Sequence, residues 1–177
     1  MARYQRNMDK ILISACLLGR PLRYNGTAKA SGSDAILDAW QAKGRLVAIC
    51  PEVAVGFPTP RPPAEIAALG DGRNAASQGA DVLAGQAAVV EKTGRDVSDL
   101  YRRAASDTVE LATRHGCRHA VLTDGSPSCG SSFIYDGSFT GVTKAGMGTT
   151  AAALRQAGVR VWAETEIAAL NVLLSES

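Results

Sequence analysis

The sequence predicts an α/β fold: a single-domain, three-layer sandwich with a mostly parallel, Rossmann-like sheet. Short apolar runs alternate with longer helical patterns, and this alternation implies parallel strands joined by right-handed crossovers. The 177 residues, 46% of them hydrophobic and 20% charged, can bury a sizeable core. No linker or internal repeat divides the chain, so we expect one domain over 1–177, with its core at 10–175.

Each expected element has a local signal. Four apolar runs read as buried strands, at 10–15, 46–49, 120–122 and 159–162. Helices are expected at 33–43, 64–69, 96–115, 149–157 and 165–174. Gly44, Gly116 and Gly158 supply stop signals for three of them. The segments 70–94 and 126–148 read as loops, the first with room for a small hairpin.

Three cysteines, Cys16, Cys50 and Cys129, stand just after apolar strand runs. The carboxyl ends of parallel strands meet at one crevice, where open α/β sheets bind ligands. No Cys-x-x-Cys pair occurs, which excludes a local zinc or ferredoxin module. Two readings remain: a metal or cluster site assembled by the fold, or three small buried side chains. Cys117 precedes its strand at the opposite edge and is expected to be structural.

Two polar groups accompany these thiols. Glu52 follows Cys50 by two residues, and a carboxylate in a crevice can be a general base, a ligand or an ion-pair partner. In Ser126-Pro127-Ser128-Cys129-Gly130, hydroxyls and turn residues surround a thiol, where they can bond cluster sulfides or an anionic substrate, or simply form a turn. The only histidines, His115 and His119, flank the other end of the third strand, so a Ser-His-Asp triad is not expected.

Basic residues also fall in the expected crevice loops. Arg20, Arg23, Lys29 and Arg61 suit phosphate or carboxylate recognition, although each could equally be a solvated surface charge. Gly146-Met147-Gly148-Thr149-Thr150 opens a helix whose amides could receive a phosphate.

Composition excludes several partners. The net charge of +2, the pI near 8.4 and an aromatic content of 5% do not support a DNA-binding surface or a stacking platform for nucleic-acid strands, so neither DNA nor tRNA is expected. No apolar run can span a membrane. The stretch 11–15 before Cys16 is too short for a signal peptide. We therefore expect a cytoplasmic protein with reduced thiols.

Three blocks, in order along 11–164, together resemble the thiouracil desulfidase family. They are Ser14-Ala15-Cys16-Leu17-Leu18-Gly19 with Arg23-Tyr24-Asn25-Gly26, Cys50-Pro51-Glu52 with Pro58-Thr59-Pro60-Arg61-Pro62-Pro63-Ala64-Glu65-Ile66, and Ser126-Pro127-Ser128-Cys129-Gly130 with Ile134-Tyr135-Asp136-Gly137.

The resemblance implies a [4Fe–4S] cluster held by only three cysteines, Cys16, Cys50 and Cys129, with one iron open for the substrate's sulfur. It implies conversion of the C=S of thiouracil, or of a 4-thiouridine-derived nucleotide such as 4-thio-UMP, to C=O with release of sulfide. Glu52 corresponds to the family's acid/base residue and Ser126 to its functional serine. The candidate substrate-binding residues are Arg20, Arg23, Tyr24, Lys29, Arg61 and Ser128.

Two other functions remain open at this point. An open iron also supports a cluster lyase or a sulfur-transfer enzyme. A protein that binds thionucleotide without turning it over is the second alternative.

Overall fold

Four parallel strands form the centre of the molecule, and their order is β2-β1-β5-β8. The computed structural model describes residues 9–69 and 77–176. The strands are β1 (Lys10–Ser14), β2 (Leu46–Ile49), β5 (Cys117–Leu122) and β8 (Arg160–Ala163). All four expected strands are therefore present, each shifted by no more than a few residues.

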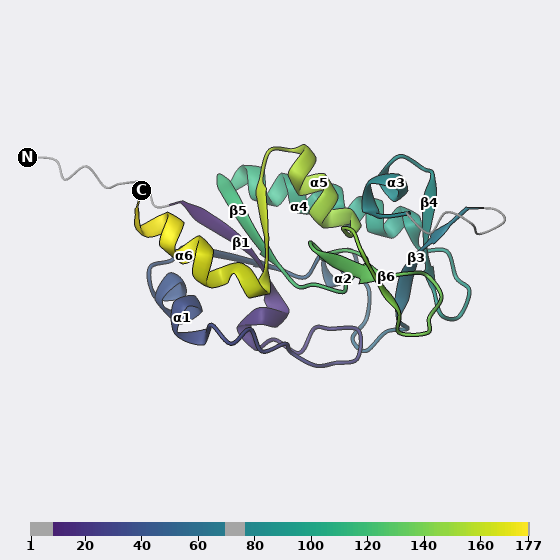
Figure 1. Ribbon diagram of the computed structural model, residues 1–177, viewed down its shortest axis with the longest axis horizontal. Helices are drawn as coiled ribbons and strands as arrows, with labels where there is room; N and C mark the ends of the chain where they lie inside the picture. Colours follow the sequence, from purple (N-terminus) through teal and green to yellow (C-terminus); the bar gives the residue numbers. More distant parts are fainter. Residues whose placement is uncertain (1–8, 70–76, 177) are drawn as a thin grey trace, which may run out of the picture.

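Helices cover both faces of this sheet (Figure 1). Side chains alternate along β1, so Ile11 and Ile13 face α1 (Asp34–Ala42) and α6 (Ile167–Ser175). Leu12 points to the other face, where its apolar cluster includes residues of α4 (Ser98–Arg114) and α5 (Thr149–Gln156). The predicted α/β sandwich of three layers is confirmed.

The order of the strands places a ligand crevice between β1 and β5. The chain passes from β1 to β2 on one side and then returns across β1 to form β5 on the other, so the strand order reverses there. Open α/β sheets bind ligands outside the carboxyl ends of the strands at such a reversal. The single-turn helix η1 (Ala15–Leu18) follows β1, and the short helix α2 (Pro51–Ala54) follows β2 at this edge.

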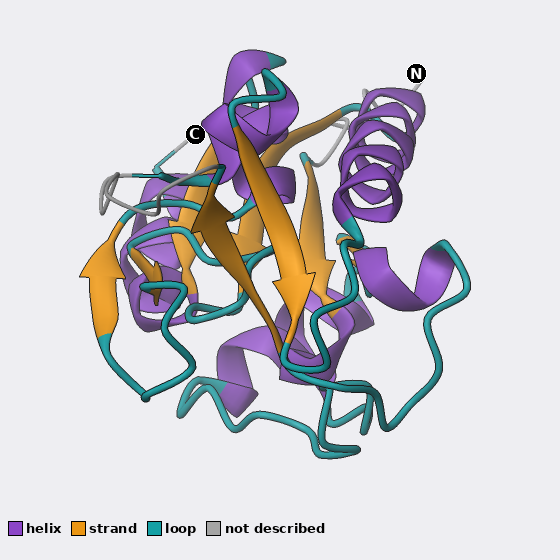
Figure 2. Cartoon of the chain, turned by 90° about the vertical axis from the view of Figure 1, so that its right-hand side faces the viewer, coloured by secondary structure: helices purple, strands orange, loops and turns teal. Residues whose placement is uncertain are grey.

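A smaller layer of antiparallel structure lies at one end of the sheet, to the right in Figure 1 and toward the viewer in Figure 2. It contains the pair β3 (Ala64–Ala68) and β4 (Ala87–Glu91), the helix α3 (Gly79–Leu83), and the pair β6 (Phe133–Tyr135) and β7 (Thr143–Ala145). Ile66 of β3, Val89 of β4 and Ile134 of β6 meet Tyr101 of α4 in a third apolar cluster. This layer forms one wall of the site.

The structure corrects the sequence predictions in this layer. Residues 64–69 were expected to be a helix, but Ala64–Ala68 pairs with Ala87–Glu91. Within 70–94, the part at 70–76 lies outside the described residues, and the remainder includes α3 and β4 rather than loop alone. The long loop 126–148 contains the β6–β7 pair. Cys117 does not precede its strand but is the first residue of β5.

A helix that crosses a bilayer needs about 20 predominantly apolar residues. Over 9–69 and 77–176, no helix has both the length and the apolar character needed to cross a membrane.

Candidate functional site

The carboxyl ends of β1, β2 and β5 open on a cavity of about 390 Å³. Its walls include the thiols of Cys16, Cys50 and Cys129 together with Glu52 and Ser126. Segments far apart in the sequence therefore bring five candidate site residues to one place, at the reversal of strand order.

Local structure positions the first two thiols. Cys16 lies in η1, directly after β1, and its Sγ is 3.0 Å from the hydroxyl of Thr123, which follows β5. Cys50 is the N-cap residue of α2, where Pro51 supplies a first helical residue that needs no N–H partner. Its Sγ lies 3.6 Å from Glu52 Oε2, so the thiol and the carboxylate share one turn.

The third thiol sits on a loop that is clamped by α5. The amide of Thr149 donates to Pro127 O at 2.8 Å, and the amide of Thr150 donates to Ser128 O at 2.9 Å. These bonds use the N-terminal amides of α5 to hold the loop that carries Cys129. The same amides are therefore not free to bind a phosphate, as the glycine pattern had suggested.

Ser126 links this loop to Glu52. Its hydroxyl oxygen accepts the amides of Ser128 at 3.0 Å and Cys129 at 3.1 Å. The same hydroxyl donates to Glu52 Oε1, with the oxygens 3.4 Å apart. Ser126 therefore shapes the turn around the thiol and directs its proton toward the carboxylate.

Arg61 is a buried cation beside this carboxylate. Its Nη2 lies 3.9 Å from Glu52 Oε1, and its side chain is only 6% exposed. Nη1 donates to the carbonyl of Leu22 at 3.1 Å, which fixes the guanidinium against the loop that follows β1. Arg61 is thus part of the cavity wall and not a solvated surface charge.

Burial disfavours ionisation of the three thiols. It raises the pKa of Cys50 to about 11, and the nearby Glu52 carboxylate adds to this rise. Burial likewise raises the pKa of Cys16 and, more strongly, that of Cys129, again with Glu52 contributing. Thiols must lose their protons to bind a metal. A cationic group in the cavity would reverse this balance, since it would favour the thiolates.

The donor set consists of three thiols, and thiolate is the ligand that iron–sulfur clusters use. Across the described part of the chain, no three His, Cys, Asp or Glu side chains converge closely enough for a single ion. In an iron–sulfur cluster each thiolate binds a different iron, so the ligands stand farther apart than around one ion. Three thiols from separate segments of the chain line this one cavity.

The remaining candidates divide into two groups. Arg23, Tyr24 and Lys29 line the cavity. Arg20 does not: it is exposed and lies in a separate shallow depression with Leu18. Ser128 is fully buried, and its hydroxyl lies 2.8 Å from that of Thr150. The side chain therefore faces the N-terminal end of α5 and not the cavity.

Sequence reasoning missed an ionic network behind Cys16. Lys29 Nζ forms an ion pair with Glu164, which follows β8, and also donates to Asp124 O at 3.5 Å. Glu164 Oε2 accepts the amide of Asp124 at 2.6 Å. The network connects the segments that follow β1, β5 and β8. In it, the positive charge of Lys29 is already paired with the carboxylate of Glu164.

Asp124 is a second missed residue. Burial works to raise the pKa of its carboxyl group, but hydrogen bonds from Ser132 and Ser131 outweigh it, and the net effect is a lowered pKa. The amides of Ser131 and Ser132 each lie 2.8 Å from Asp124 Oδ1. An ionised carboxylate thus organises the start of β6. The only signal in the sequence that could have indicated a role for Asp124 is its position between the predicted strand 120–122 and Ser126.

Together, the open α/β fold and the cysteine-lined cavity define an enzyme-like domain with a fold-assembled thiol site. The family model described as 2-thiouracil desulfurase matches residues 11–166, and the chain belongs to that family. The uncharacterized protein YbbK of Bacillus subtilis (strain 168) is 44% identical over 157 residues, which cover 89% of this chain and 97% of YbbK.

A solved structure is similar over nearly the whole chain. It is that of the [4Fe-4S]-dependent thiouracil desulfidase TudS, with 44% sequence identity and a TM-score of 0.80. The match covers 96% of this chain and 99% of the TudS chain. The membership predicted from the three sequence blocks is therefore confirmed.

Proposed function

We propose that the protein is a [4Fe–4S]-dependent desulfidase that hydrolyses the C=S group of a thiopyrimidine to C=O. The observation that carries the proposal is the arrangement of Cys16, Cys50 and Cys129 around one cavity that also contains the buried carboxylate of Glu52. The similar structure is that of TudS, which is a [4Fe-4S]-dependent thiouracil desulfidase, and this supports both the proposed cluster and the proposed reaction.

Cys16, Cys50 and Cys129 would hold the cluster, and one iron would be left without a protein ligand. The fourth cysteine, Cys117, begins β5 at the amino end of the sheet, whereas the cavity lies at the carboxyl end. When bound, such a cluster supplies a Lewis-acidic iron with affinity for the soft sulfur of a thiocarbonyl.

Glu52 is the proposed general base. Its carboxylate lies within the cavity wall, where it can accept a proton from a water molecule that attacks the ring carbon. The water oxygen forms the new C=O bond, the C=S bond breaks, and the sulfur leaves as sulfide. Oxygen replaces sulfur at the same oxidation level, so no external electron donor is required. Ser126 holds Glu52 in place through its hydroxyl.

The favoured substrate is 4-thio-UMP, because the cavity contains cations that are available for a phosphate. Lys29 is paired with Glu164, and Arg61 lies beside Glu52. Arg23 and Lys92 also line the cavity, and neither forms an ion pair with any residue in 9–69 or 77–176. These two side chains are therefore the candidates for a contact with the phosphate. DNA and tRNA are not proposed as substrates.

We also propose a cytoplasmic location. All four cysteines are free thiols, as expected for a reducing compartment, and cluster assembly needs them in that state.

The deciding experiment is anaerobic reconstitution with iron and sulfide, followed by assays for uracil and sulfide from 4-thiouracil. We expect a brown protein that forms both products in equal amounts. A preparation that takes up no cluster defeats the proposal. A loaded protein that transfers sulfur to an acceptor or acts as a lyase supports the other enzyme class, and binding without turnover supports a sensor.

Substrate size is tested separately by comparing kcat/KM for 4-thiouracil, 4-thiouridine and 4-thio-UMP. A phosphate site predicts an advantage of at least tenfold for the nucleotide, equivalent to about 1.4 kcal/mol. Arg23→Gln should remove most of that advantage and leave the rate with the free base unchanged. A smaller advantage would contradict a dedicated phosphate site.

A further inference from the structure

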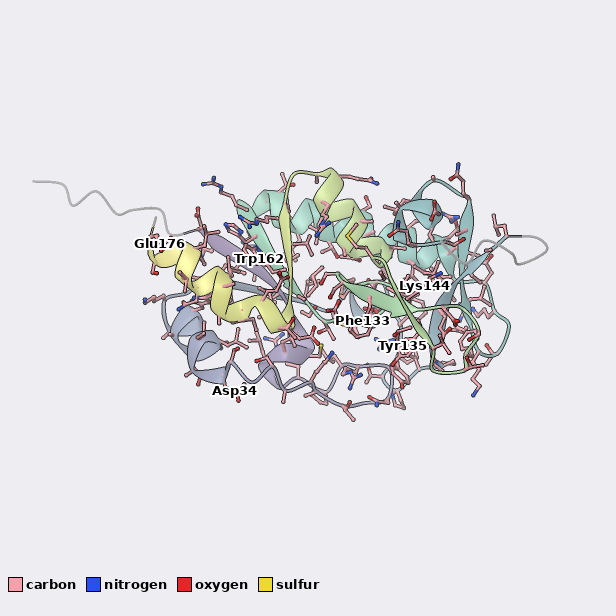
Figure 3. The ribbon with its side chains drawn as sticks, in the orientation of Figure 1. Asp34, Phe133, Tyr135, Lys144, Trp162 and Glu176 are labelled. Carbon is pink, nitrogen blue, oxygen red and sulfur yellow. The ribbon has the colours of Figure 1, made fainter. Side chains whose placement is uncertain are left out.

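The strand β6 presents two aromatic rings at the cavity. Phe133 and Tyr135 both line it, and each is 38% exposed (Figure 3). Ile134 between them is 1% exposed and packs in the third apolar cluster. Because side chains alternate along a strand, the two rings lie on the face opposite Ile134. We call Phe133 and Tyr135 the aromatic pair.

Gly125 places the aromatic pair next to the reacting groups. A Cβ atom built on Gly125 would lie 3.4 Å from Phe133 Cε2 and 3.6 Å from Tyr135 Cε2, so both rings pack against this residue. The amide of Gly125 also donates to Phe133 O at 3.1 Å. Gly125 immediately precedes Ser126, and the apolar surface therefore adjoins the hydroxyl that contacts Glu52.

The two ends of β6 are fixed independently. Before the strand, the carboxylate of Asp124 accepts the amides of Ser131 and Ser132. After it, Glu65 Oε2 accepts the amides of Gly137 at 2.9 Å and Phe139 at 3.1 Å. The backbone that carries the rings is therefore held in position before any ligand arrives, which lowers the entropy cost of binding.

Aromatic residues are concentrated around this cavity. They form only 5% of the chain, and yet the lining contains Tyr24, Tyr101, Phe133, Tyr135 and Phe139. The low aromatic content argued against a platform for a nucleic-acid strand, but a single base needs only one or two rings. Partly exposed rings on a fixed strand suit a flat, aromatic ligand, since the faces of bases stack on aromatic side chains.

We propose that the aromatic pair is the stacking surface for the pyrimidine ring of the substrate. The inference rests on the proposed desulfidase function and adds the residues that bind the base. Stacking on β6 would set the base beside Gly125 and Ser126, in the cavity that the three thiols also line. The aromatic pair acts in binding and takes no part in proton transfer.

The test compares Phe133→Leu, Tyr135→Leu and the double variant with the wild-type holoenzyme. KM for 4-thiouracil and Kd for uracil, measured by calorimetry, should rise together by about tenfold in the double variant, with kcat within about twofold of the wild type. Tyr135→Phe keeps the ring and should keep wild-type binding. Val142→Ala is the matched control, because Val142 is 53% exposed in the same hairpin but does not line the cavity.

Cluster absorbance and thermal unfolding should be unchanged in every variant, which separates binding from folding. A double variant with wild-type KM and Kd overturns the proposal, as does one that loses kcat alone. A wild-type protein that binds uracil through these rings but releases no sulfide from 4-thiouracil supports the stacking surface and defeats the desulfidase reaction.

Discussion

Ser126 donates a hydrogen bond to Glu52 across the cavity, with Oγ and Oε1 3.4 Å apart. The same oxygen accepts two amides of its own loop, so the orientation of the carboxylate depends on the fold of the loop that carries Cys129. The proposed proton transfer by Glu52 and the placement of the Cys129 thiol therefore both depend on the Ser126 hydroxyl.

Removal of this hydroxyl should affect both properties. Ser126→Ala leaves the amides of Ser128 and Cys129 without an acceptor, so we expect a loss of about 1–3 kcal/mol in the free energy of unfolding. Turnover should fall as well. Urea unfolding monitored by circular dichroism measures the first effect. Ser175→Ala, which removes an exposed hydroxyl from α6, is the control. Equal stability of the two variants would contradict the bridging role of Ser126.

Glu52→Gln tests the general base. Glutamine keeps the size of the side chain and can still accept the hydrogen bond from Ser126, but it cannot take up the proton of the attacking water. We expect kcat to fall by about 10²–10⁴-fold with normal cluster absorbance and KM. Full activity in this variant would refute the assignment of Glu52 as the base.

The four cysteines should differ in their effect on cofactor content. Alanine at Cys16, Cys50 or Cys129 should impair cluster assembly, measured as iron and acid-labile sulfide per chain. Cys117→Ala should keep the wild-type content of iron and acid-labile sulfide, because Cys117 lies at the amino end of β5. Loss of iron in Cys117→Ala at unchanged stability would mean that the ligand set has been assigned incorrectly.

Stability of the cofactor-free protein should depend on pH above 9. Burial raises the pKa of Cys50 and of Cys117 from 9.0 to about 11, with Glu52 also contributing at Cys50. Between these values the unfolded chain releases thiol protons that the folded chain retains, so the free energy of unfolding falls as pH rises. Urea titrations from pH 8 to 11 measure the slope. Cys117→Ala should have a shallower slope than the wild type, and an identical slope would contradict this account.

The close approach of the β6–β7 hairpin to β3 can be tested with two glycines. A Cβ at Gly137, where φ is +96°, would lie 2.7 Å from the carbonyl oxygen of Ile66. Gly141 has a similar φ of +82° but meets no atom within 4 Å. Gly141→Ala should cost about 1–2 kcal/mol from backbone strain alone. Gly137→Ala should cost more, and thermal unfolding would show the difference. Equal losses would mean that the hairpin can shift away from β3.

Local sequence signals were sufficient for the central sheet and its helices. Buried strands such as β1 are continuous apolar runs, and glycines mark the ends of α1, α4 and α5. The same reasoning failed at Ala64–Ala68, since Ala-Glu-Ile-Ala-Ala has a high helix propensity but pairs with the distant strand Ala87–Glu91. Three-residue strands such as β6 are too short to show a period.

The site was predictable to the extent that it lies at strand ends. The positions of Cys16 and Cys50 follow from the direction of a parallel sheet, whereas Cys129 lies on a loop beyond β5 that hydrogen bonds from α5 hold in place. The role of Glu65 could not be foreseen, because it depends on β3 being a strand whose side chain meets the β6–β7 hairpin. Asp124 and Glu164 were missed for a similar reason: their bond joins the ends of β5 and β8.

The wide separation of the three cysteines along the chain has a further consequence. A group bound to all of them would cross-link the ends of β1, β2 and β5, much as a disulfide does, and would restrict the unfolded chain. Loss of the group would then lower the free energy of unfolding as well as stop the proposed turnover.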